Sequence, residues 1–173
     1  MLADIDVVSS YSRVDAEHHR ERGLRSDHFR AIADLDGMNT VMPVPRILIA
    51  DDQEEMVGTI AQALANEFDI IGTAQDGKRA VELATQLFPD ILILDISMPL
   101  VNGIEAAWRL KRLASPTRII FVTVHSDPDF VEAARSAGAL GYVWKESVAS
   151  DLAPAVRAVL QGNRFTSPSM PFH

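Results

Sequence analysis

From residue 46 onward, short apolar runs alternate with segments in which apolar residues recur every three or four positions. Five runs have the length and continuity of buried strands: 46–50, 68–74, 91–94, 118–123 and 140–144. Around them, the helical period of apolar positions predicts helices over 54–66, 78–87, 103–113, 129–137 and 148–161. This alternation is typical of right-handed βαβ units, so we expect an α/β fold with a parallel sheet covered on both faces.

Two of these helices show clearly which residues share a side. In the helix over 103–113, one side carries Ile104, Ala107, Trp108 and Leu110. In the helix over 148–161, the inward side is formed by Leu152, Val156, Val159 and Leu160. Gly162 follows this last helix and is expected to terminate it, because glycine readily adopts the left-handed conformation that ends many helices.

The first 44 residues have a different pattern, with few large apolar side chains. A weak helical stripe within 15–35 is formed by Leu24, Phe29, Ile32 and Leu35. Any helix is then broken by Gly37, Asn39, Pro43 and Pro45. We therefore expect a flexible N-terminal extension over 1–44 with at most one short helix, a folded domain over 45–165 and a short tail over 166–173.

Composition narrows the class of protein. Among 173 residues, 24 Asp and Glu exceed 16 Lys and Arg, so the net charge is −8, which argues against a protein whose main task is to grip a phosphate backbone. The absence of cysteine excludes disulfide scaffolds, thiolate zinc sites and cysteine nucleophiles. No apolar run is long enough to span a bilayer, and the first residues lack the features of a secretory signal, so we expect a cytoplasmic protein with no membrane partner.

Polar residues stand where four of the predicted strands end. Asp51 and Asp52 follow the run 46–50, and the ends of the next strands carry Asp95, Thr123 and Lys145. In an open α/β sheet the functional crevice lies at the carboxyl ends of the strands. A single aspartate there is usually a helix N-cap, and a single lysine is usually solvated. Their joint occurrence indicates a site.

Oxygen ligands without nearby histidine or cysteine suit Mg²⁺, which leaves room for water and phosphate oxygens. A carboxylate beside such a metal can attack phosphorus and form an aspartyl phosphate. Lys145 would then offset charge on the transferring phosphoryl group, and Thr123 would donate a hydrogen bond to it. The sequence therefore predicts phosphoryl chemistry at this edge of the sheet.

These residues resemble the receiver domain of two-component response regulators. The resemblance covers about residues 45–165, and its matching pieces are Ile49-Ala50-Asp51-Asp52-Gln53, the run from Ile93 to Gly103, Phe121-Val122-Thr123 and the run from Ala137 to Lys145. It implies a flavodoxin-like fold, a doubly wound parallel sheet of five strands in the order 2-1-3-4-5.

The resemblance also implies roles for individual residues. Asp95 is the phosphoacceptor, and a sensor histidine kinase or a histidine phosphotransfer protein is the donor. Mg²⁺ is bound by Asp95, directly by Asp52, mostly through water by Asp51, and by the backbone carbonyl of Ser97. Thr123 and Lys145 contact the phosphoryl group, and Tyr142 is the aromatic residue whose inward or outward position reports activation.

Thr123-Val124-His125-Ser126-Asp127 and the ending 162–168 are similar to the NarL/FixJ-type subgroup, whose receivers precede a helix-turn-helix domain. Here the chain stops five residues after Pro168, so direct binding of nucleic acid is not expected. A homodimer through the face formed by 129–137, 140–144 and 148–161 is one expected partner. The alternatives are a receiver fragment of a DNA-binding regulator, a protein-binding module that is never phosphorylated, and a phosphohydrolase.

The phosphohydrolase alternative would need a second acidic residue where Ser97 stands, so its turnover would be slow. Glu146 follows Lys145 where many receivers have proline, which predicts a different turn in that loop. His125 is interpreted as an exposed loop residue beside the site. A last set of residues is interpreted as solvated histidines of the N-terminal extension rather than as a metal site: His18, His19 and His28.

Overall fold

The computed structural model describes residues 29–33 and 39–168, and the chain divides into two units, Met1–Val44 and Pro45–His173. In the first unit, β1 (Phe29–Ala33) and β2 (Asn39–Pro43) form an antiparallel hairpin in which Phe29 lies opposite Pro43. The helical interpretation of 15–35 is therefore wrong for Phe29–Ala33. Pairing two extended segments satisfies the hydrogen-bonding groups of their backbones. A short helix with only a weak apolar stripe has little tertiary packing to stabilise it in competition with the hairpin. Residues 15–28, with His18, His19 and His28, lie outside the described residues.

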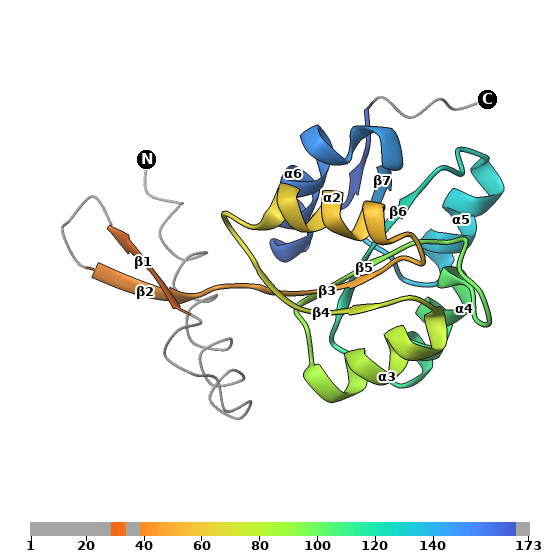
Figure 1. Ribbon diagram of the computed structural model, residues 1–173, viewed down its shortest axis with the longest axis horizontal. Coiled ribbons are helices and arrows are strands. Elements are labelled where there is room, and N and C mark those ends of the chain that lie inside the picture. Colours follow the sequence, from red (N-terminus) through yellow and green to blue (C-terminus); the bar gives the residue numbers. More distant parts are fainter. Residues whose placement is uncertain (1–28, 34–38, 169–173) are drawn as a thin grey trace, which may run out of the picture. The chain divides into compact units, whose positions relative to one another are not determined.

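The second unit is built on one parallel sheet with the strand order β4-β3-β5-β6-β7-β8 (Figure 1). The strands are β3 (Arg46–Ala50), β4 (Asp69–Ala74), β5 (Ile91–Leu94), β6 (Arg118–Thr123), β7 (Gly141–Trp144) and β8 (Phe165–Thr166). The first five follow the order 2-1-3-4-5 along the chain, so the flavodoxin-like prediction is confirmed. β8 adds a sixth strand beyond it.

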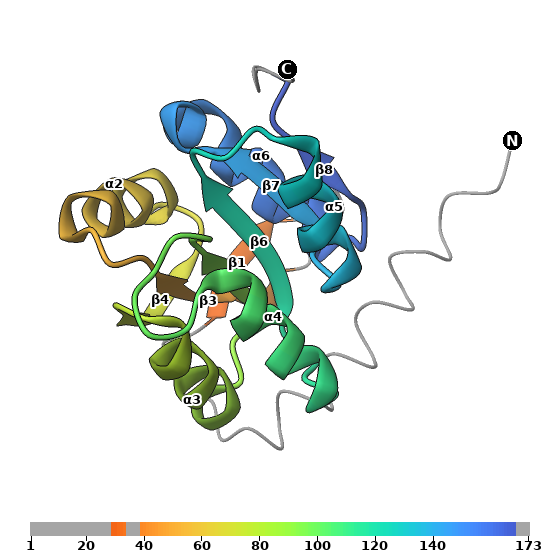
Figure 2. The same cartoon turned by 90° about the vertical axis from the view of Figure 1, so that its right-hand side faces the viewer.

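Five α-helices cover this sheet on both faces, as Figures 1 and 2 show. They are α2 (Glu54–Leu64), α3 (Gly77–Leu87), α4 (Gly103–Arg112), α5 (Pro128–Ser136) and α6 (Val148–Leu160). One face packs against α3, α4 and α5, and the opposite face packs against α2 and α6. A short 3₁₀ helix, η2 (Lys145–Ser147), joins β7 to α6.

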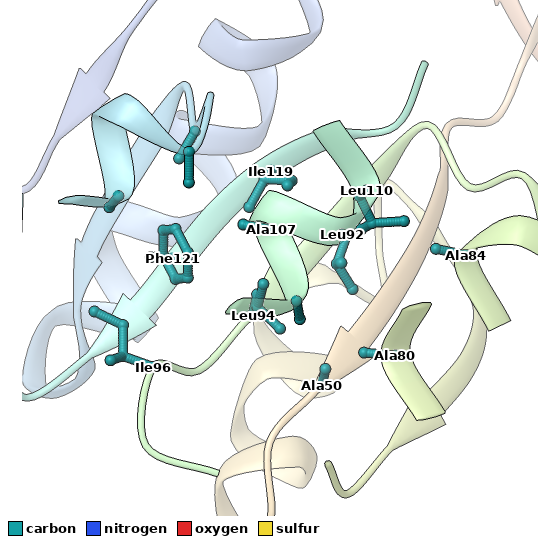
Figure 3. Packing of buried hydrophobic residues seen from close by; sticks show 14 of the residues in the cluster. Ala50, Ala80, Ala84, Leu92, Leu94, Ile96, Ala107, Leu110, Ile119 and Phe121 are labelled. Carbon is teal, nitrogen blue, oxygen red and sulfur yellow. The ribbon is translucent and has the colours of Figure 1, made fainter. Parts of the chain in front are cut away.

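Two apolar cores result, because successive side chains of a strand point to opposite faces of the sheet. On the first face, strand residues such as Leu92, Leu94 and Phe121 meet mainly alanines of the helices (Figure 3). On the second face, isoleucines and valines of the strands meet the branched side chains of α2 and α6. The small alanines let α3 and α4 approach the sheet closely.

Trp108 corrects the predicted apolar side of α4. Ala107 and Leu110 are buried as expected, but the Trp108 side chain is 41% exposed and Lys111 Nζ lies 4.7 Å from the centre of its ring. A large amphipathic ring at the border of the apolar side can remain half in water when a lysine covers its face.

The predicted tail also begins later than expected. Thr166 belongs to β8, and the neighbouring Ser167 is 1% exposed, so neither residue is part of a free tail. The Phe165 N–H donates to Leu140 O at 2.9 Å, and the Ser167 N–H donates to Tyr142 O at 2.9 Å. A strand of two residues is too short to show a period in the sequence, and it is stabilised by its pairing with β7.

Within the described residues, none of the helices combines the length and the apolar character that crossing a membrane would require.

Candidate functional site

The site lies where β3, β5, β6 and β7 end. The backbone positions its first two residues, because the ladder of parallel hydrogen bonds continues past the strands. The Asp51 N–H donates to Ala74 O at 3.0 Å, and the Asp95 N–H donates to Ala50 O at 2.8 Å. Both carboxylates are thereby fixed at one edge of the sheet, and their side chains are 1% and 3% exposed.

Three carboxylates form a cluster at this edge. One oxygen from each of Asp51, Asp52 and Asp95 can be chosen so that all three atoms lie within 4.8 Å of one another. Asp51 and Asp95 are buried, whereas Asp52 is exposed at the rim, where water is accessible. Magnesium prefers a few carboxylate oxygens together with water molecules. The donor set therefore fits this ion.

Lys145 reaches into the cluster from the end of β7. Its Nζ lies 2.8 Å from Asp51 Oδ2 and 3.1 Å from Asp95 Oδ2, and its side chain is 6% exposed. Burial raises the pKa of Asp95 and the nearby Asp51 raises it further, and the charge of Lys145 only partly opposes this. Burial lowers the pKa of Lys145, but its hydrogen bond to Asp51 and the charge of Asp95 outweigh burial, so its pKa is raised. Lys145 therefore carries its positive charge at neutral pH. The raised pKa of Asp95 means that a further cation nearby would help to keep this carboxyl group ionised.

His125 connects the site to its surroundings, contrary to its interpretation as an exposed loop residue. Its ring Nε2 is hydrogen-bonded to Ser97 Oγ at 2.6 Å. Its backbone N–H donates to the buried Thr123 Oγ1 at 3.2 Å. Its ring stacks on Phe130 of α5 with 4.3 Å between ring centres. No local sequence pattern signals these contacts, because they join the loop of His125 to the loop after β5, to the end of β6 and to α5.

Tyr142 occupies the inward position, with 4% of its surface exposed. Its hydroxyl donates to His125 O at 3.0 Å, and its ring lies 6.3 Å from that of Phe121. Burial, and to a smaller extent the charge of Asp127, raise the pKa of Tyr142, so the hydroxyl stays protonated and can donate. The backbone of His125 thus joins Thr123 to Tyr142.

Gly103 is a further residue that the site requires. A Cβ at this position would collide with the carbonyl group of Asp95, and the Gly103 N–H donates to Ile96 O at 2.9 Å. The first turn of α4 therefore packs directly against the backbone that carries Asp95. The sequence contained this glycine in the run from Ile93 to Gly103 but offered no reason for it.

The structure thus brings the side chains of Asp51, Asp52, Asp95 and Lys145 into one cluster. His125 is hydrogen-bonded to Thr123, to Tyr142 and to the Ser97 side chain, so these predicted residues are joined to one another. Of the flanking residues, Val124 is 55% exposed.

Comparisons with known proteins agree with this geometry. The profile of the response regulator receiver domain matches residues 47–157. The chain is 43% identical over 114 residues to the transcriptional regulatory protein PdtaR of Mycobacterium tuberculosis, covering 64% of this chain and 54% of that protein. It is 35% identical over 130 residues to the uncharacterized transcriptional regulatory protein YvfU of Bacillus subtilis, covering 74% and 65%. The chain therefore spans only part of the length of these relatives, less than two thirds in each.

Solved structures show the same architecture. The receiver domain of the putative response regulator NarL from Mycobacterium tuberculosis superposes with a TM-score of 0.67 at 29% identity, covering 69% of this chain and 98% of that one. The isolated receiver domain of RcsB from Salmonella enterica serovar Typhimurium, in the presence of the phosphomimetic BeF₃⁻, gives a TM-score of 0.68 at 26% identity, covering 73% and 96%.

Proposed function

Because the chain belongs to the receiver domain family of two-component response regulators, we propose that Asp95 accepts a phosphoryl group from a sensor histidine kinase or a histidine phosphotransfer protein. The observation that carries this proposal is the position of Asp95. It is a buried carboxylate that lies both in the acidic cluster and in contact with Lys145. Asp95 directly follows β5, a strand in the interior of the sheet, and its backbone carbonyl packs against Gly103.

In the proposed step, an Asp95 carboxylate oxygen forms a bond to phosphorus while the bond from phosphorus to the donor's imidazole nitrogen breaks. The electron pair of the broken bond remains on that nitrogen. Lys145 offsets negative charge on the phosphoryl oxygens, and the Thr123 hydroxyl donates a hydrogen bond to one of them. Thr123 Oγ1 accepts from the His125 N–H, and a hydroxyl that accepts a bond can still donate its own proton.

Mg²⁺ is the proposed cofactor, held by Asp95, by Asp52 directly, by Asp51 mostly through water, and by the Ser97 backbone carbonyl. When bound, this ion supplies the positive charge that lets three carboxylates and a phosphoryl group share one site. The chain itself contributes the fixed oxygen donors, and the exposed Asp52 keeps the site open to water.

The proposed output is a switch in a protein-binding surface. A phosphoryl group on Asp95 adds charge and acceptor oxygens. Thr123 moves toward them, and His125 and Tyr142 follow, because backbone and hydroxyl hydrogen bonds connect them. We expect the affected face to consist of α5, β7 and α6 and to bind a second copy of the chain, and we propose that this signalling takes place in the cytoplasm. Since several curated relatives are longer and are named transcriptional regulatory proteins, output onto a DNA-binding domain is the alternative.

The proposed function is tested by incubating the chain with Mg²⁺ and acetyl phosphate and measuring its intact mass. We expect the gain of a single phosphoryl group, which Asp95→Asn abolishes. The control Asp129→Asn changes an exposed aspartate in the first turn of α5 and keeps the gain. If the native chain gains nothing, it is a module that is never phosphorylated. If it releases phosphate rapidly over many turnovers, it is a phosphohydrolase.

A further inference from the structure

The segment after α6 lies beyond the part of the chain that the family profile matches, which ends at residue 157. In the structure this segment is not a free connection, because Phe165 and Thr166 form β8 in parallel with β7. Figure 2 shows β8 beside β7 at the edge of the sheet. β7 is also the strand that carries Tyr142 and leads directly into Lys145.

Ser167 makes two hydrogen bonds to β7. Its N–H donates to Tyr142 O at 2.9 Å, and its Oγ accepts from the Trp144 N–H at 3.1 Å. The residue is 1% exposed, although its neighbours Thr166 and Pro168 are exposed. A single buried serine therefore binds both ends of the last three residues of β7.

The hydrogen bonds of Ser167 are made to residues that immediately precede Lys145 in the sequence. Trp144 directly precedes Lys145, whose Nζ is 2.8 Å from Asp51 Oδ2 and 3.1 Å from Asp95 Oδ2. Within the described residues the sheet ends with β8, so no other strand lies on that side of β7. The position of the Lys145 ammonium depends on where the backbone of β7 ends, and small displacements of a charge-stabilising group reduce the rate of group transfer strongly.

We propose that Ser167 is a positioning residue for phosphoryl transfer: its hydroxyl and N–H hold the carboxyl end of β7, so that Lys145 stays on Asp51 and Asp95. The inference rests on the proposed function, and it extends the working site into a segment outside the family match. The carboxylates that would bind Mg²⁺ follow β3 and β5 and do not depend on Ser167. A change at Ser167 should therefore slow phosphoryl transfer without weakening metal binding, because an ammonium that moves away from Asp51 and Asp95 no longer competes with the metal ion.

The test compares Ser167→Val with Ser167→Thr. The two side chains have the same shape, and only threonine keeps the hydroxyl. With Mg²⁺ and acetyl phosphate, we expect Ser167→Val to be phosphorylated about 3- to 30-fold more slowly than Ser167→Thr. The Mg²⁺ affinity measured by calorimetry should not be weaker in Ser167→Val than in Ser167→Thr. Thr166→Val, at the exposed neighbouring position, is the control and should behave like the native chain.

A second measurement uses no phosphodonor. Lys145 is buried and Lys78 is exposed, so acetylation by an amine-reactive ester should label Lys145 slowly relative to Lys78. We expect Ser167→Val to label Lys145 at least about threefold faster than Ser167→Thr does, relative to Lys78 in the same sample.

Equal labelling of Lys145 in the two variants, or equal rates of phosphorylation, would overturn the inference. So would a loss of Mg²⁺ affinity in Ser167→Val as large as its loss of transfer rate, because that result indicates general destabilisation. If the native chain accepts no phosphoryl group at all, the proposed function fails, and the labelling of Lys145 alone decides whether Ser167 positions it.

Discussion

The helices α5 and α6 both flank β7, on opposite faces of the sheet, but they are attached in different ways (Figure 1). α6 buries five side chains: Val148, Leu152, Ala155, Val156 and Val159. Of the nine residues of α5, all of which the structure describes, Ala134 alone is buried. Apolar burial therefore anchors α6 far more strongly than α5.

α5 depends instead on contacts at its two ends. At the start, the Asp127 carboxylate accepts from the Asp129 N–H at 2.9 Å, and the His125 ring stacks on Phe130. At the end, Lys111 Nζ of α4 donates to Ser136 O at 2.8 Å. Such contacts are individually weak and can be exchanged without opening the core. A displacement at Thr123 would therefore reach α5 through His125 and move α5 more than α6.

The strong attachment of α6 is also seen in its tolerance of a residue that disfavours helices. Pro154 lies in its interior, where proline removes one backbone hydrogen bond and crowds the preceding turn. The helix nevertheless continues to Leu160. Burial of the apolar side of α6 thus stabilises this helix by more than the proline destabilises it, whereas α5 has little apolar burial.

The largest expected effect comes from removing apolar burial in each helix. Leu152→Ala in α6, at a fully buried position, should lower the free energy of unfolding by about 2–5 kcal/mol. Val131→Ala in α5, at a half-buried position, should lower it by less than about 1.5 kcal/mol. Urea denaturation of both variants measures the difference. Equal losses would mean that α5 is anchored as firmly as α6.

Pro154→Ala sharpens the contrast further. Restoring the missing N–H and relieving the crowding in α6 should raise the free energy of unfolding by about 1–2 kcal/mol, less than the full helix penalty of proline because the ring is partly buried. The same denaturation experiment measures it, with the phosphorylation rate as a check that the site is intact. A decrease in stability would show that packing of the proline ring matters more than the lost hydrogen bond.

The side-chain cap at the start of α5 should contribute to stability, because α5 has little apolar burial. Asp127→Ala removes the side-chain bond at the start of α5 and should lower the free energy of unfolding by about 0.5–2 kcal/mol. The matched change Asp127→Asn keeps a side-chain oxygen that can accept from the Asp129 N–H and should cost less than about 0.5 kcal/mol. Thermal unfolding gives both values. A loss in Asp127→Asn as large as that in Asp127→Ala would contradict the role of this cap.

The smallest effect concerns His125 and is local. His125→Ala removes the bond to Ser97 and the ring stacked on Phe130, and we expect amide hydrogen exchange in α5 to rise about threefold while α6 is unchanged. His125→Phe keeps an aromatic ring against Phe130 and should restore most of the protection. Exchange measured by mass spectrometry distinguishes these results. A rise in α6 as large as that in α5 would contradict the proposed separation of the two helices.

The sequence predicted several elements with their observed bounds, and the reason is their burial on both faces. The strands Arg46–Ala50, Ile91–Leu94 and Arg118–Thr123 are nearly continuous apolar runs bounded by polar residues. The acidic cluster with Lys145 could be predicted as well, because parallel strands bring their carboxyl ends to one edge whatever the lengths of the helices between them. The sequence therefore places Asp51, Asp95 and Lys145 at the same edge of the sheet, and the tertiary structure decides how close they lie.

Other features had no such signal. The hairpin of β1 and β2 and the two-residue strand β8 are stabilised by pairing with another segment, which no local period records. The same holds for His125, whose partners Ser97, Phe130 and Tyr142 come from three other parts of the chain. Trp108 fell on the apolar side of its helix by spacing, yet it is 41% exposed, with Lys111 Nζ over its ring.

By itself, the sequence determined the order of strands and helices and the kinds of groups at the strand ends, because both follow from burial and from the chirality of βαβ connections. Only the tertiary structure decided the charge balance around Asp95, the path from Thr123 to Tyr142 and the attachment of Ser167 to β7. These depend on distances of a few ångströms between segments far apart in the chain, and such distances are fixed only when the two cores have packed.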